Sequence, residues 1–339
     1  MADYTKTQAR EWAKKNWNGA IAVTIPSYSA DFASINENAI RHDIHKLKEL
    51  GFAGTLLVTE VAITPEENAR VTAVAREAAG PDFHIFFHAA FNTLEENIYA
   101  LQLAEKEGAD SVLISYPTAF WPTSLDEVFD YTKRLADSTD LGAMLFGLPA
   151  WGFERIHNAG MPVHFVRRVI DEIPNIVAVK AEQGLPSIAG VMEMYENFSE
   201  EVVISCPLEA DAIPLMSKLK FHFSGTSNTN WMSDYFPNAF ELAQDGKWDE
   251  AMDMWWKVAP ARAANTTILT AAAGGTTVIN RTAWKYQEWL AGFNGGALRA
   301  PAPRIPDRLM KLARQSLIAS GLPCTDLPDS EFVKGRVKP

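Results

Sequence analysis

Cysteine is scarce in this chain of 339 residues, which has only Cys206 and Cys324, far apart in the sequence. Two isolated cysteines supply neither a disulfide framework nor a C-x-x-C metal motif, and this pattern is typical of proteins from a reducing cytoplasm. No apolar run approaches the roughly 20 residues that a membrane-spanning helix needs, and the N-terminus lacks the apolar segment of a secretory signal. We therefore expect a cytoplasmic protein with no membrane partner.

Positive charge is also in deficit, because 31 Lys and Arg are outnumbered by 42 Asp and Glu, which gives a formal net charge of −11. Binding to a phosphate backbone requires clustered Lys and Arg, and no such cluster occurs, so nucleic acid is not expected as a partner. The H-x-H and H-E-x-x-H spacings of zinc sites are missing, as is a Gly-rich dinucleotide-binding turn after the first expected strand. We expect neither a metal ion nor a bound cofactor.

The chain does contain a repeated alternation of short buried strands and amphipathic helices. Helix starts are marked by capping residues, for example Asn36 and Thr64, the latter followed by Pro65 and two glutamates. The expected strands cover residues 19–26, 54–59, 84–88, 111–115, 143–147, 176–180, 202–205 and 221–225. Eight such units predict an α/β fold, the closed (β/α)₈ TIM barrel. An open doubly wound sheet is the alternative.

Beyond residue 235 only helical patterns remain, over residues 239–244, 248–266, 281–290 and 307–320. We therefore expect two domains: a barrel with an N-terminal arm over residues 1–235, and a C-terminal helical domain over residues 236–339. A helical extension of this size either covers one face of the barrel or forms an oligomer surface.

Lys180 follows the apolar run Ile176-Val177-Ala178-Val179 and stands where that strand is expected to end. In barrels of this kind, residues at the C-terminal ends of strands tend to be catalytic. An ammonium in apolar surroundings tends to lose its proton, and a neutral amine is the nucleophile that condenses with a ketone to form a Schiff base. The alternative is an ordinary solvated lysine at the start of a loop. Glu182 lies on the same side if the strand continues, where it would hold or deprotonate the lysine, or it is a solvated loop acid.

The other expected strand ends supply hydroxyl, carboxylate and aromatic side chains around this lysine. This set suits imine chemistry on a carbonyl compound better than metal or serine-hydrolase chemistry. Tyr116 is a candidate for a functional role at the barrel mouth. The candidates for substrate binding are Thr59, Glu60, Phe146, Trp151, Ser224 and Thr226. His88 is a further candidate. For three of these residues a structural role is the alternative: Glu60 would cap a helix, Tyr116 would cover the barrel end, and His88 would be a hydrogen-bonded residue of the barrel wall.

The segment from Asn175 to Gly184 resembles the lysine strand of the dihydrodipicolinate synthase and N-acetylneuraminate lyase superfamily. Thr24-Ile25-Pro26, Asn92-Thr93 and Leu298-Arg299-Ala300-Pro301 extend the resemblance over most of the chain. It implies a (β/α)₈ barrel with C-terminal helices, a homo-oligomer (a dimer or tetramer), and Lys180 as the amine that forms a Schiff base with pyruvate or another 2-oxo acid.

Three departures from that family bear on the substrate. Where the family has Gly-Thr-Thr-Gly-Glu to hold a carboxylate, this chain has Leu56-Leu57-Val58-Thr59-Glu60. Where it has Tyr-Asn-x-Pro, with a tyrosine that transfers protons, this chain has Phe146-Gly147-Leu148-Pro149, and phenylalanine cannot transfer protons. The comparison implies that Tyr116 or a bound water takes over the proton transfer. Trp151 stands where dihydrodipicolinate synthases carry an arginine. True dihydrodipicolinate synthase activity is therefore not expected.

The aromatic residues of the expected barrel mouth, Phe120, Trp121, Phe146 and Trp151, are similar to those of hydratase-aldolases that act on aryl-substituted 2-oxo acids. We expect a Schiff-base lyase, either an aldolase or a hydratase-aldolase, that acts on a small-molecule substrate, a pyruvate-derived 2-oxo acid that can carry an aromatic or bulky substituent. A sugar-acid dehydratase that uses the same imine is one alternative. A barrel that binds a ligand without catalysis is another, and formation of an imine would exclude it.

Overall fold

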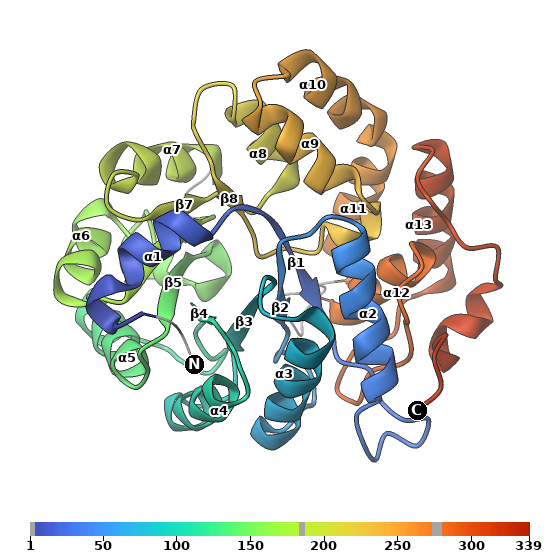
Figure 1. The fold of residues 1–339 in the computed structure, drawn as a ribbon, viewed down its shortest axis with the longest axis horizontal. Helices are drawn as coiled ribbons and strands as arrows, with labels where there is room; N and C mark the ends of the chain where they lie inside the picture. Colours follow the sequence, from blue (N-terminus) through green and yellow to red (C-terminus); the bar gives the residue numbers. More distant parts are fainter. Residues whose placement is uncertain (1–3, 183–186, 273–279) are drawn as a thin grey trace.

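Eight parallel strands form the centre of the computed structural model, which describes residues 4–182, 187–272 and 280–339 (Figure 1). They run in the order β7-β6-β5-β4-β3-β2-β1-β8. Their bounds are β1 (Gly19–Thr24), β2 (Gly54–Leu57), β3 (His84–Ala89), β4 (Ser111–Ile114), β5 (Gly142–Gly147), β6 (Ile176–Ala181), β7 (Val203–Ser205) and β8 (Phe223–Ser224).

The barrel closes between β7 and β8 through the side chain of Ser205. Its hydroxyl donates to the carbonyl oxygen of Gly225 at 2.6 Å and accepts from the backbone N–H of Gly225 at 3.1 Å. The prediction of a (β/α)₈ TIM barrel is confirmed, and the open doubly wound sheet is wrong because the two ends of the sheet meet.

Helices surround the strands, and the capping residues that predicted their starts are confirmed. The side chains of Asn36, Thr64, Thr93 and Ser124 each accept a hydrogen bond from a backbone N–H three residues further on, which satisfies a donor that the first turn leaves free. The helices are α2 (Glu37–Glu49), α3 (Pro65–Ala79), α4 (Leu94–Lys106), α5 (Leu125–Asp137), α6 (Val163–Glu172), α7 (Ser187–Phe198), α8 (Glu209–Leu215) and α9 (Tyr235–Gln244).

The N-terminal arm contains α1 (Ala9–Asn16), which covers the end of the barrel where the strands begin. The hydroxyl of Tyr4 accepts from the N–H of Gly142, the first residue of β5, at 2.8 Å. The guanidinium of Arg10 donates to the carbonyl of Ile176, the first residue of β6, at 2.9 Å. The arm thus packs against the end of the barrel opposite to the one where Lys180 lies.

Four further helices, α10 (Trp248–Lys257), α11 (Ala259–Ala272), α12 (Arg281–Leu290) and α13 (Asp307–Ala319), form the C-terminal extension. The expectation of one helix over residues 248–266 is wrong: α10 ends at Lys257 and α11 starts at Ala259. Pro260 lacks a backbone N–H, so it fits the first turn of a helix but not the interior of a longer one. Short 3₁₀ segments complete the secondary structure: η1 (Lys6–Gln8), η2 (Pro149–Trp151), η3 (Phe153–Arg155), η4 (Asn230–Met232) and η5 (Asp329–Lys334).

The helix α12 lies over the C-terminal end of β1. The ammonium of Lys285, on α12, donates to the carbonyl of Ile25 at 3.3 Å and to the hydroxyl of Ser27 at 3.0 Å, just beyond β1. The helix thereby brings its own first residues to the barrel mouth. The helix α9 contacts β1 as well, and the division of the chain into domains at residue 235 stays a prediction.

Trp289 anchors α12 in the core of the extension. It is 0% exposed, and its ring centroid lies 5.8 Å from that of Tyr286 and 6.0 Å from that of Phe332. We expect Trp289→Ala to lower the free energy of unfolding by about 3–5 kcal/mol, because it leaves a large cavity. The 64% exposed Trp256 provides the control, and Trp256→Ala is expected to change stability by no more than about 0.5 kcal/mol. Urea denaturation of both variants checks this, and equal losses would contradict it.

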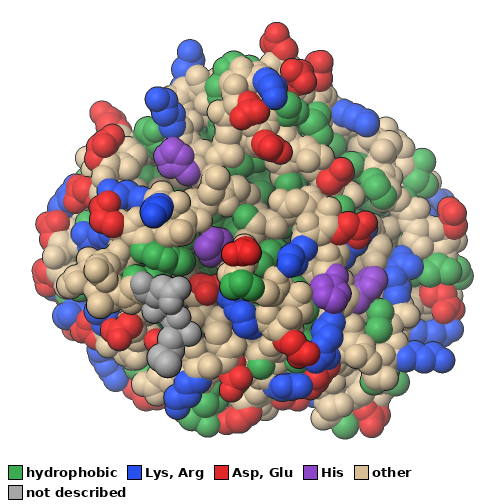
Figure 2. Space-filling model, in the orientation of Figure 1, with side chains coloured by type: hydrophobic (Ala, Val, Ile, Leu, Met, Phe, Trp, Pro, Cys, Tyr) green, Lys and Arg blue, Asp and Glu red, His purple; other side chains and the backbone are tan. Residues whose placement is uncertain are grey.

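The surface shown in Figure 2 carries Lys and Arg side chains interspersed with Asp and Glu, with no continuous basic area on this face. No helix in the described part of the chain is long and apolar enough to cross a membrane. Cys206 and Cys324 are both free.

Candidate active site

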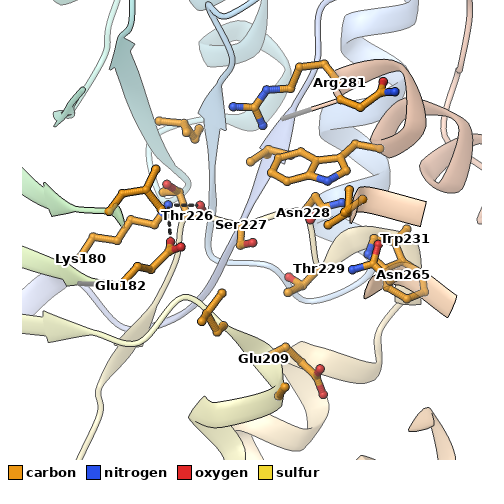
Figure 3. Close-up of a pocket in the computed structure, with 18 of the residues that line it drawn as sticks. Lys180, Glu182, Glu209, Thr226, Ser227, Asn228, Thr229, Trp231, Asn265 and Arg281 are labelled. Atoms are coloured by element: carbon orange, nitrogen blue, oxygen red, sulfur yellow. Dashed lines mark hydrogen bonds and ion pairs between the residues drawn. The ribbon is translucent and has the colours of Figure 1, made fainter. Parts of the chain in front are cut away.

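A pocket of about 550 Å³ opens at the C-terminal ends of the strands (Figure 3). Its apolar floor comes from the barrel interior and includes Val23, Leu56 and Leu113. Its outer wall comes from the C-terminal extension, with Arg262, Asn265 and Leu269 on α11, Asn280 just before α12, and Arg281 and Trp284 on α12. The extension therefore covers the mouth of the barrel, which was one of the two roles expected for it.

Lys180 lies inside this pocket and is 5% exposed. Its ammonium donates to the carbonyl oxygen of Thr226 at 2.8 Å and lies 3.4 Å from a carboxylate oxygen of Glu182 (Figure 3). The pairing of β5 with β6 sets Phe146 beside Lys180, and the Nζ atom is 3.9 Å from the centroid of the Phe146 ring. One face of the amine is thus apolar and the other carries a carboxylate.

Burial lowers the pKa of Lys180 from its ordinary value of 10.5, because the charged form loses its hydration. The nearby carboxylate of Glu182 opposes this shift, and the positive charge of Arg281 adds to it. The net direction is downward, so more of the amine is neutral at physiological pH than in an exposed lysine. A neutral amine is the form that attacks a carbonyl carbon.

Glu60 and Arg281 form an ion pair in the same pocket. Burial alone would raise the pKa of Glu60, but the positive charge of Arg281 holds it below the usual value. Burial lowers the pKa of His88 to about 4, so its imidazole is neutral at pH 7. One ring nitrogen of His88 lies 3.0 Å from the hydroxyl of Ser115, and the other has no partner among the described residues.

Four of the predicted residues, Glu60, Phe146, Lys180 and Thr226, line the pocket together. Three predicted substrate-binding residues do not. Each has a structural hydrogen bond instead: Thr59 donates to the carbonyl of His88 at 2.6 Å, Ser224 to the carbonyl of Cys206 at 2.6 Å, and the indole of Trp151 to the carbonyl of Phe146 at 3.0 Å. Ser224 thus joins β8 to the end of β7, and Trp151 packs behind Phe146 at 5.5 Å between ring centroids.

The predicted proton-transfer residue, Tyr116, does not face the pocket. Ser115 points inward to His88, so the alternation of side chains along the strand turns Tyr116 outward, toward the helices. Its hydroxyl lies 2.7 Å from that of Thr132 on α5, and its ring packs against Tyr131 and Phe153. Burial also raises the pKa of Tyr116, which makes it a poorer acid. We therefore assign Tyr116 to the wall of the barrel.

This placement predicts that Tyr116→Phe keeps turnover within about twofold of the wild type, since no reacting group loses a partner. The variant should lose about 0.5–1.5 kcal/mol of stability, the contribution of one buried hydrogen bond. Steady-state kinetics and thermal unfolding check both. A fall in turnover by orders of magnitude at unchanged stability would restore the role predicted from the sequence.

Sequence reasoning missed Arg281 and Asn280, both of which line the pocket. Glu182, expected either to hold or deprotonate Lys180 or to be a solvated loop acid, lines the pocket as well. In the sequence, Asn280 and Arg281 only mark the start of a helix, a hundred residues after Lys180. No local pattern therefore indicated that they belong to the site. Among the described residues, no group of three His, Cys, Asp or Glu side chains is arranged to hold a metal ion.

The structure is a closed barrel whose sixth strand carries a buried amine. Helices of the C-terminal extension cover that amine. These features are those of (β/α)₈ barrels with a site at the C-terminal ends of the strands. The model of the dihydrodipicolinate synthetase family matches residues 33–269. The chain belongs to that family.

Individual relatives are distant. An uncharacterised DapA-like lyase from Pyrobaculum arsenaticum is 22% identical over 316 residues, which are 90% of this chain and 98% of that protein. The crystal structure of dihydrodipicolinate synthase from Aquifex aeolicus superposes with a TM-score of 0.76 at 18% identity, over 91% of this chain and 100% of the other. N-acetylneuraminate lyase from Fusobacterium nucleatum superposes with a TM-score of 0.70 at 17% identity, over 89% and 98% of the two chains. These similarities establish the shared fold.

Proposed function

We propose that this protein is a Schiff-base-forming lyase that acts on a 2-oxo acid. The observation that carries the proposal is the amine of Lys180, which is buried at the end of a barrel strand, shifted toward its neutral form and open to a pocket. Membership of the dihydrodipicolinate synthetase family supports it.

In the proposed reaction the neutral amine of Lys180 attacks the carbonyl carbon of the substrate, and loss of water from the resulting carbinolamine gives the protonated imine. That imine accepts the electron pair of the carbon–carbon bond that breaks, and an enamine forms; in the synthetic direction the enamine returns the pair. Proton transfers accompany each step. We assign the proton transfers of the carbon–carbon bond step to the carboxylate of Glu182, 3.4 Å from the amine, in place of the family's tyrosine.

The pocket favours a substrate larger than pyruvate itself. Its volume of about 550 Å³ lies within the range of ligand sites for molecules of many heavy atoms. Its apolar lining includes Phe146, Leu148, Trp231, Met232 and Trp284, which supports a bulky or aromatic substituent. A polar side made of Ser227, Asn228, Thr229 and Asn265 supports the second candidate, a dehydratase that takes a hydroxylated sugar acid. Phe146 in place of the family's tyrosine continues to disfavour dihydrodipicolinate synthase itself.

Reduction by borohydride tests the proposal, because it converts an imine to a stable secondary amine. The protein is incubated with pyruvate, aryl-substituted 2-oxo acids or sugar-derived 2-oxo acids, reduced, and weighed by intact-mass spectrometry. We expect one adduct per chain, with more labelling by the preferred class. Product analysis then separates carbon–carbon cleavage from loss of water. If no 2-oxo acid labels the protein, the chain is a ligand-binding barrel rather than a Schiff-base enzyme.

We also propose a homo-oligomer, a dimer or a tetramer, in the cytoplasm. The support is the resemblance to a family of oligomeric barrels and the scarcity of cysteine. Light scattering coupled to size-exclusion chromatography measures the mass directly, and a mass near the 37.5 kDa of one chain would refute the oligomer.

A further inference from the structure

The guanidinium of Arg281 is bound to protein on one side only. Its Nη2 atom pairs with Glu60, whereas Nε and Nη1 have no hydrogen-bond partner among the described residues. The side chain is 6% exposed, so water replaces few of these bonds. Buried donors without acceptors are costly, by about 1–3 kcal/mol each and more for charged groups. An edge of a buried guanidinium left open in a pocket therefore indicates a ligand that supplies acceptors.

Other donors around Arg281 are unpaired in the same way. The amide nitrogens of Asn228 and Asn280 and the indole nitrogen of Trp284 are buried in the lining of the pocket and have no partner among the described residues. Asn280 also caps α12, since its side-chain oxygen accepts from the N–H of Ala283 at 3.0 Å. The positive end of that helix thus faces the pocket. A group of unpaired donors at a helix N-terminus matches an anionic oxygen ligand.

A second arginine in the pocket shows what a completed pair looks like. Arg262 donates from Nε and Nη2 to the two carboxylate oxygens of Glu209, at 2.8 Å and 2.6 Å, and its guanidinium lies 4.1 Å from a ring centroid of Trp255. Arg281 is held in a similar way, 4.3 Å from the ring of Trp284. Its carboxylate partner, however, accepts from Nη2 alone, so Nε and Nη1 keep unpaired N–H groups that can donate to a second carboxylate.

We infer that Arg281, with Asn228, Asn280 and Trp284, is the subsite that binds the carboxylate of the 2-oxo acid. Figure 3 shows Arg281 and Asn228 on one side of the pocket and Lys180 with Glu182 on the other. A substrate between them has its carbonyl at the amine and its carboxylate at the guanidinium. The subsite thus takes over the task of the carboxylate-binding threonines that this chain lacks. The identity of the ligand rests on the proposed function, whereas the anion site stands on the unpaired donors.

The test compares charged and uncharged carbonyl compounds in matched variants. Arg281→Lys keeps the charge but loses the planar guanidinium, and Arg281→Met with Glu60→Gln removes the pair without leaving the partly buried Glu60 carboxylate unpaired. Arg262→Met with Glu209→Gln is the control, since it removes the completed pair. The measurement is the concentration for half-maximal borohydride labelling by pyruvate and by hydroxyacetone, in which an uncharged hydroxymethyl group replaces the carboxylate. We expect both Arg281 variants to need on the order of 100-fold more pyruvate, with the hydroxyacetone value and the control unchanged.

A different result would place a second, more distant carboxylate of the substrate at Arg281. In that case the Arg281 variants would label with pyruvate as the wild type does, but would no longer discriminate between 2-oxoglutarate and 2-oxobutanoate. Equal losses for pyruvate and hydroxyacetone, or no change with any anion, would overturn the subsite. The anion site is tested without imine chemistry in the Lys180→Ala background, where pyruvate should raise the melting temperature and the added Arg281→Met and Glu60→Gln changes should abolish the rise. If the wild type forms no imine but this rise is seen, the proposed function fails and the anion site stands.

Discussion

Lys180→Met is expected to abolish imine formation and to lower turnover by about 10⁴-fold or more, the order of loss seen when a covalent nucleophile is removed. Methionine fills much of the space of the lysine stem but carries no amine. The substitution leaves the Glu182 carboxylate, 3.4 Å from the amine, without its partner, and removing one member of a buried pair is destabilising. The variant should therefore fold with a lower melting temperature than the wild type, and Lys180→Met combined with Glu182→Gln should recover part of the loss. Intact-mass spectrometry after borohydride reduction, kinetics and thermal unfolding measure the three quantities.

Lys285 serves as the internal control for this experiment. It is 1% exposed, and burial lowers its pKa to about 8, so low exposure and a shifted pKa are common to both lysines. Its ammonium, however, is held by Ile25, Pro26 and Ser27 and does not line the pocket. Peptide mapping should find the label on Lys180 alone. Label on Lys285 as well, or an unchanged mass increase in Lys180→Met, would show that labelling does not report an active-site imine.

Much of the barrel was predictable because its signals are local. Proline at 65 and the glutamates after it mark the start of α3 whatever surrounds them, and the predicted bounds of α12 match the structure. The break between α10 and α11 was not predicted, because the apolar pattern runs through it and only Pro260 marks it. Local rules therefore give the elements but not every boundary.

The candidate site was predictable only where strand position decides it. The end of an apolar strand places Lys180 in the barrel mouth regardless of distant contacts. Tyr116 also follows an apolar strand, but side chains alternate across a strand, and its direction depends on a register that no local pattern fixes. Arg281 enters the site from a helix a hundred residues away, so only tertiary structure brings it to Glu60. A prediction built from the strand ends therefore misses the site residues that the covering helices supply.

Glu182→Gln is expected to lower turnover by about 10²- to 10⁴-fold, the usual contribution of a positioned acid or base. The amide keeps the shape and a hydrogen-bonding oxygen beside Lys180 but cannot accept a proton. The same change should act in the opposite direction on the first step. The Glu182 carboxylate stabilises the ammonium and so raises the pKa of Lys180, against the larger effect of burial. Its removal therefore lowers that pKa further, and the pH at which imine labelling reaches half of its maximal rate should move to lower pH.

These two opposed changes separate a proton-transfer role from a structural one. A variant that merely loosens the pocket would slow both steps, whereas loss of the proton-transfer group slows turnover and leaves labelling at neutral pH as fast or faster. Glu209→Gln is the matched control, because Glu209 lines the same pocket but is tied to Arg262 and Tyr235, and it should leave the pH profile of labelling where it was. Unchanged turnover in Glu182→Gln, or a shift of the profile to higher pH, would remove Glu182 from the mechanism and leave the proton transfers to bound water or to the substrate's own carboxylate.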